Sequence, residues 1–283
     1  MLSVTKIEEA IDAFIASDPP EDHHITIPPR SGKRNYLGLS GLGDECARAV
    51  WYGYRECVKK TFPMRLHRLF RRGDREEFVF VWLLRGIGFT VHEKDAEGKQ
   101  FKVTDFEGHL SGHMDGVGEA PRKFWIRGSK QVPFLLEFKT YNDKRFNELK
   151  KRGVRKSDPK YYGQMQGYMG YENLTGALFC AVNKNDDHLY FEWVPFKRSE
   201  FDSLKDKAEM LINAQTPPAR ISSTPSDFRC RYCDFKGVCH GDEPSQKTCR
   251  SCKFASPGPD ASWECAKDKE FGTVCNLWKD VAK

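Results

Sequence analysis

The sequence predicts an α/β protein whose chain ends in a cysteine-rich extension. Segments with apolar residues at helical spacing alternate with short apolar runs that are typical of strands. The 283 residues are enough to bury a sizeable core. Seven of the ten cysteines follow residue 229, where the composition changes sharply. These three observations define a core followed by a smaller, cysteine-dependent part.

Helices and strands of the core can be assigned from these patterns. Helices are expected over 4–15, 44–55, 64–86, 161–172 and 201–212. Strands are expected over 88–93, 100–106, 109–118, 132–140, 175–183 and 188–195. Residues 18–35 are rich in proline and polar side chains and predict a loop, and "QTPPARISSTPSD" has the composition of a linker.

The composition is that of an ordinary water-soluble protein, with 39% hydrophobic and 30% charged residues. No apolar run reaches the length of a membrane span, and the N-terminus lacks the charged-then-apolar pattern of a secretion signal. We therefore expect no membrane association and a cytoplasmic location. Without a secretion signal, ten cysteines favour metal or cluster ligation over a disulfide framework.

Positive charge is concentrated in two stretches. The net charge is only +6, but "KRFNELKKRGVRKSDPK" (144–160) holds eight Lys or Arg and "RLHRLFRRGDR" (65–75) holds five Arg. Such stretches indicate a polyanionic partner, above all nucleic acid. The alternative is two solvated helix faces.

An acidic constellation lies between these basic stretches, in "GHMDGV" and "FLLEFKT". Residues two apart in a strand share a face, so Glu137 and Lys139 point to one side. Asp115 and Glu137 are hard oxygen ligands suited to Mg²⁺ or Mn²⁺, and the backbone carbonyl of Phe138 adds another. Lys139 would orient or deprotonate a water, with its pKa lowered by burial and a nearby cation. The alternative is a surface strand with a cross-strand ion pair.

The order of these motifs resembles the PD-(D/E)xK nuclease superfamily, in its RecB-like and Cas4-like branch. There, an Asp strand and an E-x-K strand are followed by a helix bearing Q-x-x-x-Y, which Gln164 and Tyr168 match. The resemblance spans about residues 37–240. It implies a mixed sheet flanked by helices, and a Gln–Tyr helix that contacts DNA and supports the active site.

The same branch carries G-x-x-x-H on a helix before the sheet. In this chain Gly73 is followed four residues later by Glu77 instead of His, which would give a third oxygen ligand. Glu76 is adjacent and stays an alternative, as does an exposed Glu77 paired with Arg75. His113 is a lesser candidate for the metal or a phosphate.

The resemblance implies a Mg²⁺- or Mn²⁺-dependent DNA exonuclease, acting without sequence preference in recombination, repair or phage DNA processing in a bacterial cytosol. Catalytic roles fall to Asp115, Glu137, Lys139, Glu77, Gln164 and Tyr168. Candidate contacts to the DNA backbone are Arg71, Arg72, Lys150, Lys151, Arg152, Arg155 and Lys156. Two alternatives stay open: a Cas4-like subunit that trims DNA only within a complex with an adaptation or recombination partner, and an inactive nucleic-acid-binding scaffold. An oligomer around DNA rests on analogy alone.

The cysteines after residue 229 form two sets. Cys230, Cys233 and Cys239 are spaced C-x2-C-x5-C and, with one remote cysteine, suit a [4Fe–4S] cluster. The remote ligand follows from a resemblance: "SGLGDECARAVWYGYR" is similar to the N-terminal segment of Cas4-like and AddB-like nucleases, which places Cys46 in the set. Zinc on the same four thiolates is the alternative.

The second set has the spacing of a structural zinc site: Cys249, Cys252, Cys265 and Cys275. A module of this length is too small to hold together by hydrophobic burial alone. The predicted domains are therefore a nuclease core over 1–227, an iron–sulfur segment over 228–242 that closes onto Cys46, and a zinc-binding module over 243–283. Cys180 is expected to be a buried apolar residue.

Overall fold

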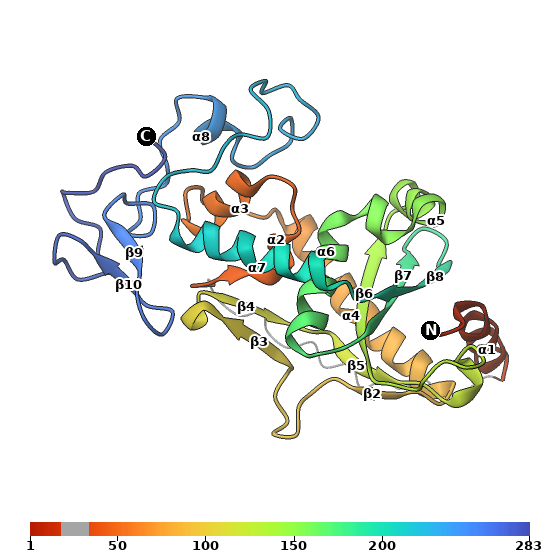
Figure 1. The fold of residues 1–283 in the computed structure, drawn as a ribbon. Coiled ribbons are helices and arrows are strands. Elements are labelled where there is room, and N and C mark those ends of the chain that lie inside the picture. The colour runs from red at the N-terminus through yellow and green to blue at the C-terminus, as the bar shows by residue number, and fades with distance from the viewer. Residues whose placement is uncertain (18–33) are drawn as a thin grey trace. The chain divides into compact units, whose positions relative to one another are not determined.

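The computed structural model describes residues 1–17 and 34–283 (Figure 1). The described chain forms two compact units, each built from separate stretches of sequence. The first comprises 1–17, 62–103 and 113–201, and the second comprises 34–61, 104–112 and 202–283. The loop predicted over 18–35 lies, apart from residues 34 and 35, outside the described residues.

The first unit contains a five-stranded mixed sheet. Its strands, in spatial order, are β2 (Thr90–His92), β5 (Gly116–Glu119), β6 (Phe134–Tyr141), β7 (Gly176–Asn183) and β8 (Leu189–Pro195). The pair β6–β7 is parallel and the other three pairs are antiparallel. Every residue of β7 is buried, as expected for a strand covered on both faces. The predicted α/β class with a mixed sheet flanked by helices is confirmed.

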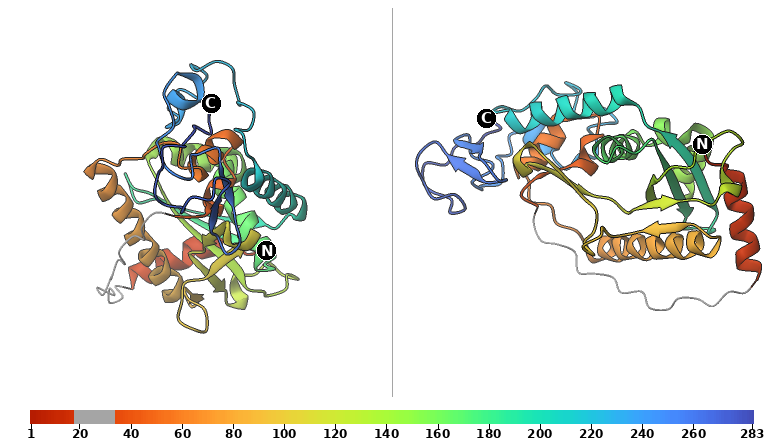
Figure 2. Two further views of the ribbon diagram at one scale, coloured as in Figure 1. Left: turned by 90° about the vertical axis from the view of Figure 1, so that its left-hand side faces the viewer. Right: turned by 60° about the horizontal axis from the view of Figure 1, so that its bottom comes forward.

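Four helices complete the first unit: α1 (Val4–Ala16), α4 (Met64–Gly86), α5 (Asp143–Ser157) and α6 (Pro159–Tyr171). Phe138 of β6 stacks on Phe80 of α4, with ring centroids 5.3 Å apart. Its neighbour Glu137 is hydrogen-bonded to Gln164 of α6. Because adjacent strand residues point to opposite faces, α4 and α6 meet β6 from opposite sides. Figure 2 shows α4 running along the sheet.

The basic stretch 144–160 forms most of α5, a helix that the apolar pattern did not predict. The Asn142 side chain accepts a hydrogen bond from the backbone N–H of Arg145 at 2.9 Å and caps its start. Phe146 and Leu149 are buried beneath the basic residues, and Gly153 interrupts the helix at φ +69°. A solvated helix face is therefore the observed structure of this stretch.

The strand predicted over 109–118 is in fact two strands in different sheets, so this prediction was wrong. β4 (Leu110–His113) pairs with β1 (Leu37–Gly38), whereas β5 pairs with β2 and β6. The buried Met114 and the partly buried Asp115 join them, and Asp115 lies outside both strands. Alternation of polar and apolar residues continues across the junction, and so it does not reveal the change of sheet.

The second unit is mostly helices and turns. Besides β1 it contains α2 (Leu39–Leu42), α3 (Ala47–Tyr54), α8 (Lys236–His240), β9 (Ala255–Pro257) and β10 (Trp263–Cys265). The chain passes between the units within β3 (Lys102–Asp105), at the end of β4 and near the start of α7 (Arg198–Asn213). Short 3-10 turns cover Phe106–Gly108 and Arg122–Phe124. None of the helices described here has the length and apolar character needed to cross a membrane.

We expect Phe80→Ala to lower the free energy of unfolding by about 3–5 kcal/mol, because it removes a ring that is 1% exposed and stacked on Phe138. Urea denaturation measures the change. The control Val79→Ala truncates the adjacent residue, which is 38% exposed, and should change stability by no more than about 0.5 kcal/mol. Equal effects of the two variants would contradict this account of the core.

Candidate active site

A buried ion-pair network lies where β6 passes the junction between β4 and β5. The Lys139 ammonium contacts the Glu137 carboxylate and lies 3.7 Å from Asp115 Oδ2. The side chains of Glu137, Asp115 and Lys139 are 0%, 15% and 18% exposed. The alternative of a surface strand with a cross-strand ion pair is not observed, because Glu137 and Lys139 both belong to β6 and Asp115 lies outside any strand. The network is also largely buried, where an unbalanced charge costs far more than at a surface.

Backbone contacts fix these side chains. The Phe138 N–H donates to Asp115 Oδ2 at 2.9 Å, so the aspartate side chain takes the place of a strand carbonyl at the interrupted pairing. The Phe138 carbonyl, predicted to be a metal ligand, accepts a hydrogen bond from Lys139 Nζ at 2.9 Å. The loop between the two strands therefore holds Asp115 directly over the Glu–Phe–Lys segment.

Helix α6 supports the site through the two residues predicted from its sequence. Gln164 Nε2 donates to Glu137 Oε1 at 2.8 Å, and the Tyr168 hydroxyl donates to the His113 carbonyl at 2.7 Å. Both side chains are buried, at 6% and 2% exposed. They are placed to position Glu137 and the chain leading to Asp115, and burial leaves them no surface for the predicted contact with DNA.

Glu77 is the third carboxylate of the cluster. Burial, followed by the negative charge of Asp115, raises the pKa of Glu77 to about 8. The adjacent Glu76 is instead directed to Arg72, at 3.6 Å. The sequence allowed either Glu76 or Glu77 as the third acid, and Glu77 is the one near Asp115 and Lys139.

The cluster has more acids than cations. Burial raises the pKa of Glu137 to about 7, even though Lys139 lowers it. Glu137 Oε2 is buried and has no hydrogen-bond partner. Three carboxylates against one ammonium, with an unpaired buried oxygen among them, fit a hard divalent cation such as Mg²⁺ or Mn²⁺. In the described residues no three His, Cys, Asp or Glu side chains are already arranged to hold a metal, and Lys139 lies between Asp115 and Glu137.

Lys139 is held in its charged form. Burial lowers the pKa of Lys139, but Glu137 and Asp115 outweigh this effect, and the pKa is raised well above its ordinary value. The expectation of a lowered pKa was therefore wrong, because the two carboxylates beside the ammonium outweigh the effect of its burial. The Tyr161 ring, 5.0 Å from Lys139 Nζ, adds a cation–π contact that the sequence did not reveal.

A pocket of about 580 Å³ opens beside the cluster. Its lining combines acidic, basic and aromatic side chains: Leu69, Phe70, Gly73, Asp74, Glu76, Glu77, Phe138, Lys139, Thr140, Tyr141, Asn142, Arg145, Tyr161 and Lys184. Arg145 and Lys184 were missed by the sequence analysis. Burial and the charges of Arg72, Arg65 and Arg145 lower the pKa of Lys184, so several cations meet at this end of the pocket. Arg145 also pairs with the buried Asp158.

The predicted DNA-contacting residues lie on α4 and α5. Lys150, Lys151, Arg152, Arg155 and Lys156 are exposed on α5, as is Arg71 on α4. Arg152 pairs with Glu148 and Arg155 with Glu200, both at 2.8 Å. Exposed pairs of this kind contribute about 0–1 kcal/mol. Arg72 alone reaches the pocket lining, through a 2.9 Å hydrogen bond to the Lys184 carbonyl.

In the second unit, the structure gathers the first set of cysteines. The pKa values of Cys230 and Cys233 are raised, first by burial and then by charges that include Cys46 and Cys239. Cys46 is the N-cap residue of α3, and Cys239 lies in α8. Cys46 and Cys239 are therefore close enough to influence Cys230 and Cys233 electrostatically, but no three of the described cysteines are arranged to hold a metal.

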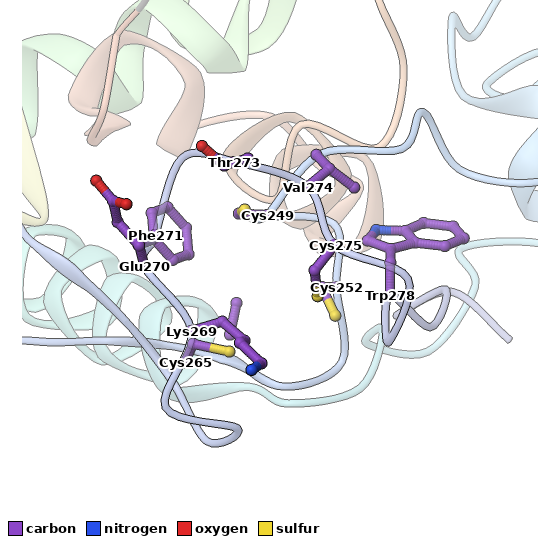
Figure 3. A pocket seen from close by; sticks show the side chains of 11 residues that line it. Cys249, Cys252, Cys265, Lys269, Glu270, Phe271, Thr273, Val274, Cys275 and Trp278 are labelled. Carbon is purple, nitrogen blue, oxygen red and sulfur yellow. The ribbon is translucent and has the colours of Figure 1, made fainter.

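The second set of cysteines lines one pocket (Figure 3). Cys249, Cys252, Cys265 and Cys275 surround it together with Phe271 and Trp278, among others. The backbone N–H of Gly272 donates a hydrogen bond to Cys249 Sγ at 3.3 Å. Four cysteines are the donor set of a structural zinc site, but in the part of the chain that the structure describes they are not arranged to hold a metal. Cys180, as predicted, is fully buried among apolar residues.

We expect the stability of the first unit to fall as the pH rises from about 5 to 8 in the absence of divalent cations. Glu77 and Glu137 have folded-state pKa values of about 8 and 7, above their ordinary value of 4.5. The folded state then binds more protons than the unfolded state across this window, so deprotonation destabilises it. In Glu77→Gln, Tm should fall less steeply with pH. Each kcal/mol of unfolding free energy that the variant regains at high pH should raise Tm by about 2–4 °C.

Thermal unfolding at several pH values between these limits tests the prediction. Glu97→Gln, which replaces an exposed carboxylate, is the control and should follow the native profile. If Tm falls with pH equally steeply in Glu77→Gln and in the native protein, deprotonation of Glu77 does not destabilise the folded state.

Comparison with known proteins gives only distant similarities. No family model and no curated protein matches the chain. Among solved structures the chain is similar to SSO0001, with 16% identity over 83% of this chain and 95% of that chain and a TM-score of 0.40. It is also similar to the alkaline exonuclease LHK-Exo from Laribacter hongkongensis, with 15% identity, 62% and 86% coverage and a TM-score of 0.41. LHK-Exo in complex with dAMP gives 14% identity, the same coverages and a TM-score of 0.44.

Proposed function

We propose that the protein is a divalent-metal-dependent deoxyribonuclease that hydrolyses phosphodiester bonds. The observation that carries this proposal is the buried cluster in which Glu77, Asp115 and Glu137 outnumber the single ammonium of Lys139. Such a concentration of negative charge is costly in a folded core unless a cation compensates for it. Its place at the wall of a pocket with further basic side chains supports an anionic substrate.

Glu77, Asp115, Glu137 and the Phe138 carbonyl would hold Mg²⁺ or Mn²⁺. When bound, such an ion supplies activation of a water and neutralisation of charge on the phosphate. The residues of the chain do the rest. The protonated Lys139 stabilises negative charge that develops on the phosphate oxygens. Gln164 orients Glu137 by its hydrogen bond, and Tyr168 fixes the backbone before Asp115.

DNA is the proposed substrate, bound through its backbone without sequence preference. The exposed Lys and Arg residues of α4 and α5 supply charge for phosphate contacts. We infer exonuclease rather than site-specific endonuclease activity, in recombination, repair or phage DNA processing in a bacterial cytosol. A DNA-holding protein without catalysis is the second candidate, because the Lys139–Glu137 pair also balances part of the charge without a metal.

The cysteine sets are proposed to be structural metal sites. Cys46, Cys230, Cys233 and Cys239 would hold a [4Fe–4S] cluster, which needs four thiolates. Cys249, Cys252, Cys265 and Cys275 would hold zinc. Since Cys46 precedes α3 and the others lie near α8, a metal in the first set would close a loop of more than 180 residues within the sequence.

We expect the purified protein to degrade end-labelled DNA only when Mg²⁺ or Mn²⁺ is added. Digestion of single- and double-stranded substrates labelled at either end reports the need for metal and the polarity together. Lys139→Ala should lower the rate by about a hundredfold or more while binding persists, because it removes the charge that stabilises the transition state.

The control for this experiment is Lys130→Ala, which removes an exposed lysine and should leave the rate unchanged. Full activity of Lys139→Ala would remove the catalytic assignment. Binding without cleavage by the native protein under every metal condition would leave the DNA-holding protein.

We expect anaerobically purified protein to be coloured and to contain both iron and zinc, as measured by elemental analysis. Cys233→Ser should lose iron and keep zinc, and Cys265→Ser should do the reverse, because each replaces one ligand of a different set. Cys180→Ala, which lies in neither set, should keep both metals. A colourless protein with zinc in both sets would replace the cluster by a second zinc ion.

A further inference from the structure

The turn that carries Cys230 and Cys233 presents two aromatic rings to solvent. Phe228 is 80% exposed and Tyr232 is 86% exposed, the highest values among the large apolar side chains of the described residues. Single exposed apolar residues are common and need no explanation. Here, however, the two exposed rings stand two residues before and two residues after Cys230 in the sequence. Cys230 itself is only 6% exposed.

Backbone hydrogen bonds fix this segment as a turn. The N–H groups of Cys230 and Arg231 both donate to the Asp227 carbonyl, at 2.9 and 2.8 Å, and Cys233 N–H donates to the Cys230 carbonyl at 3.1 Å. Because the turn directs Cys230 inward, Phe228 and Tyr232 point outward. The rings are exposed by an ordered backbone, and a ligand that binds them meets a surface that is already formed.

Each ring has a guanidinium beside it. Arg229 lies over the Phe228 ring at 5.4 Å and is oriented by two hydrogen bonds to Asp227, at 3.0 and 2.8 Å. Arg231 lies over the Tyr232 ring at 6.0 Å. Residues 219–243 contain four Lys or Arg and four acidic residues, and two of the acids are paired, Asp227 with Arg229 and Asp234 with Lys60. The surface thus combines each ring with a guanidinium, and Arg231 is the one beside Tyr232.

We propose that Phe228 and Tyr232 form a stacking platform for the unpaired bases of single-stranded nucleic acid, with Arg229 and Arg231 beside its phosphates. Every base has a flat apolar face that stacks on an aromatic ring, whereas a duplex hides these faces. The two arginines match the anionic backbone of the strand. A protein partner would instead have to place acidic groups against these arginines, and the experiment below separates the two. The platform does not depend on the proposed nuclease activity.

The test is the affinity of a fluorescently labelled oligothymidylate, measured by anisotropy in buffer without divalent cations. Under these conditions the strand stays intact whether or not the protein is a nuclease. Phe228→Ala/Tyr232→Ala should weaken binding by about tenfold or more, since two bases lose the rings on which they stack. Affinity for a hairpin duplex of the same length should change by less than about twofold.

Three variants separate stacking from other causes. Phe228→Tyr/Tyr232→Phe keeps both rings and should bind as the native protein does. Phe228→Leu/Tyr232→Leu keeps apolar surface without rings and should lose affinity as the alanine variant does. Met210→Ala, which truncates a side chain 44% exposed in the same unit, should have no effect. Unchanged Tm and metal content would show that each variant is folded.

Single-strand affinity that survives the double alanine substitution overturns the proposal. Full single-strand affinity of the leucine variant also overturns it, because an apolar surface without rings would then suffice. An equal loss of affinity for the duplex overturns it as well, because it would indicate binding to the nucleic-acid backbone alone. Arg231→Ala should in addition reduce the salt dependence of binding, which the alanine pair should leave unchanged.

Discussion

The first unit depends on one ammonium group shared by two buried carboxylates. Lys139 contacts Glu137 and is near Asp115, while Glu77 is a third carboxyl group, whose pKa burial and the charge of Asp115 raise to about 8. The neighbouring elements add hydrogen bonds without adding charge. Gln164 donates to Glu137 through a neutral amide, and Asp115 accepts from a backbone N–H. The protein thus orders three carboxyl groups around one ammonium, and two of them respond with raised pKa values because no further cation balances them.

This arrangement explains why the chain changes sheets at Asp115. A residue inside a regular strand has its backbone groups paired and its side chain directed to one face. At the junction of β4 and β5, the aspartate side chain instead accepts from the backbone of β6. The following residue must then pass close to β2, and a Cβ at Gly116 would lie 2.9 Å from the His92 carbonyl oxygen. Glycine is required there so that the aspartate can reach its position.

Much of this site could be predicted from the sequence, because strand alternation and motif order are local signals. The bounds of α4 agree with the prediction over 64–86, and β6 differs from its prediction by only two residues at the start and one at the end.

Helix α5 was missed because its apolar residues are few and Gly153 breaks their period. Arg145 and Lys184 were missed for a different reason: they come together at the pocket from positions about forty residues apart, and sheet pairing, not local sequence, determines that contact. The raised pKa of Lys139 likewise depends on distances that no sequence pattern contains.

In the second unit, a buried arginine helps to stabilise a small core. Arg55 is fully buried, lies over the rings of Trp51 and Trp263 at 5.6 and 5.2 Å, and donates to the carbonyls of Cys252 and Ala255 at 2.7 and 3.0 Å. These two carbonyls belong to the segment that carries the second set of cysteines. A guanidinium can satisfy both carbonyls and stack on both rings at once, which no apolar side chain can do. The attachment of this segment to the end of α3 therefore depends on Arg55 and needs no metal.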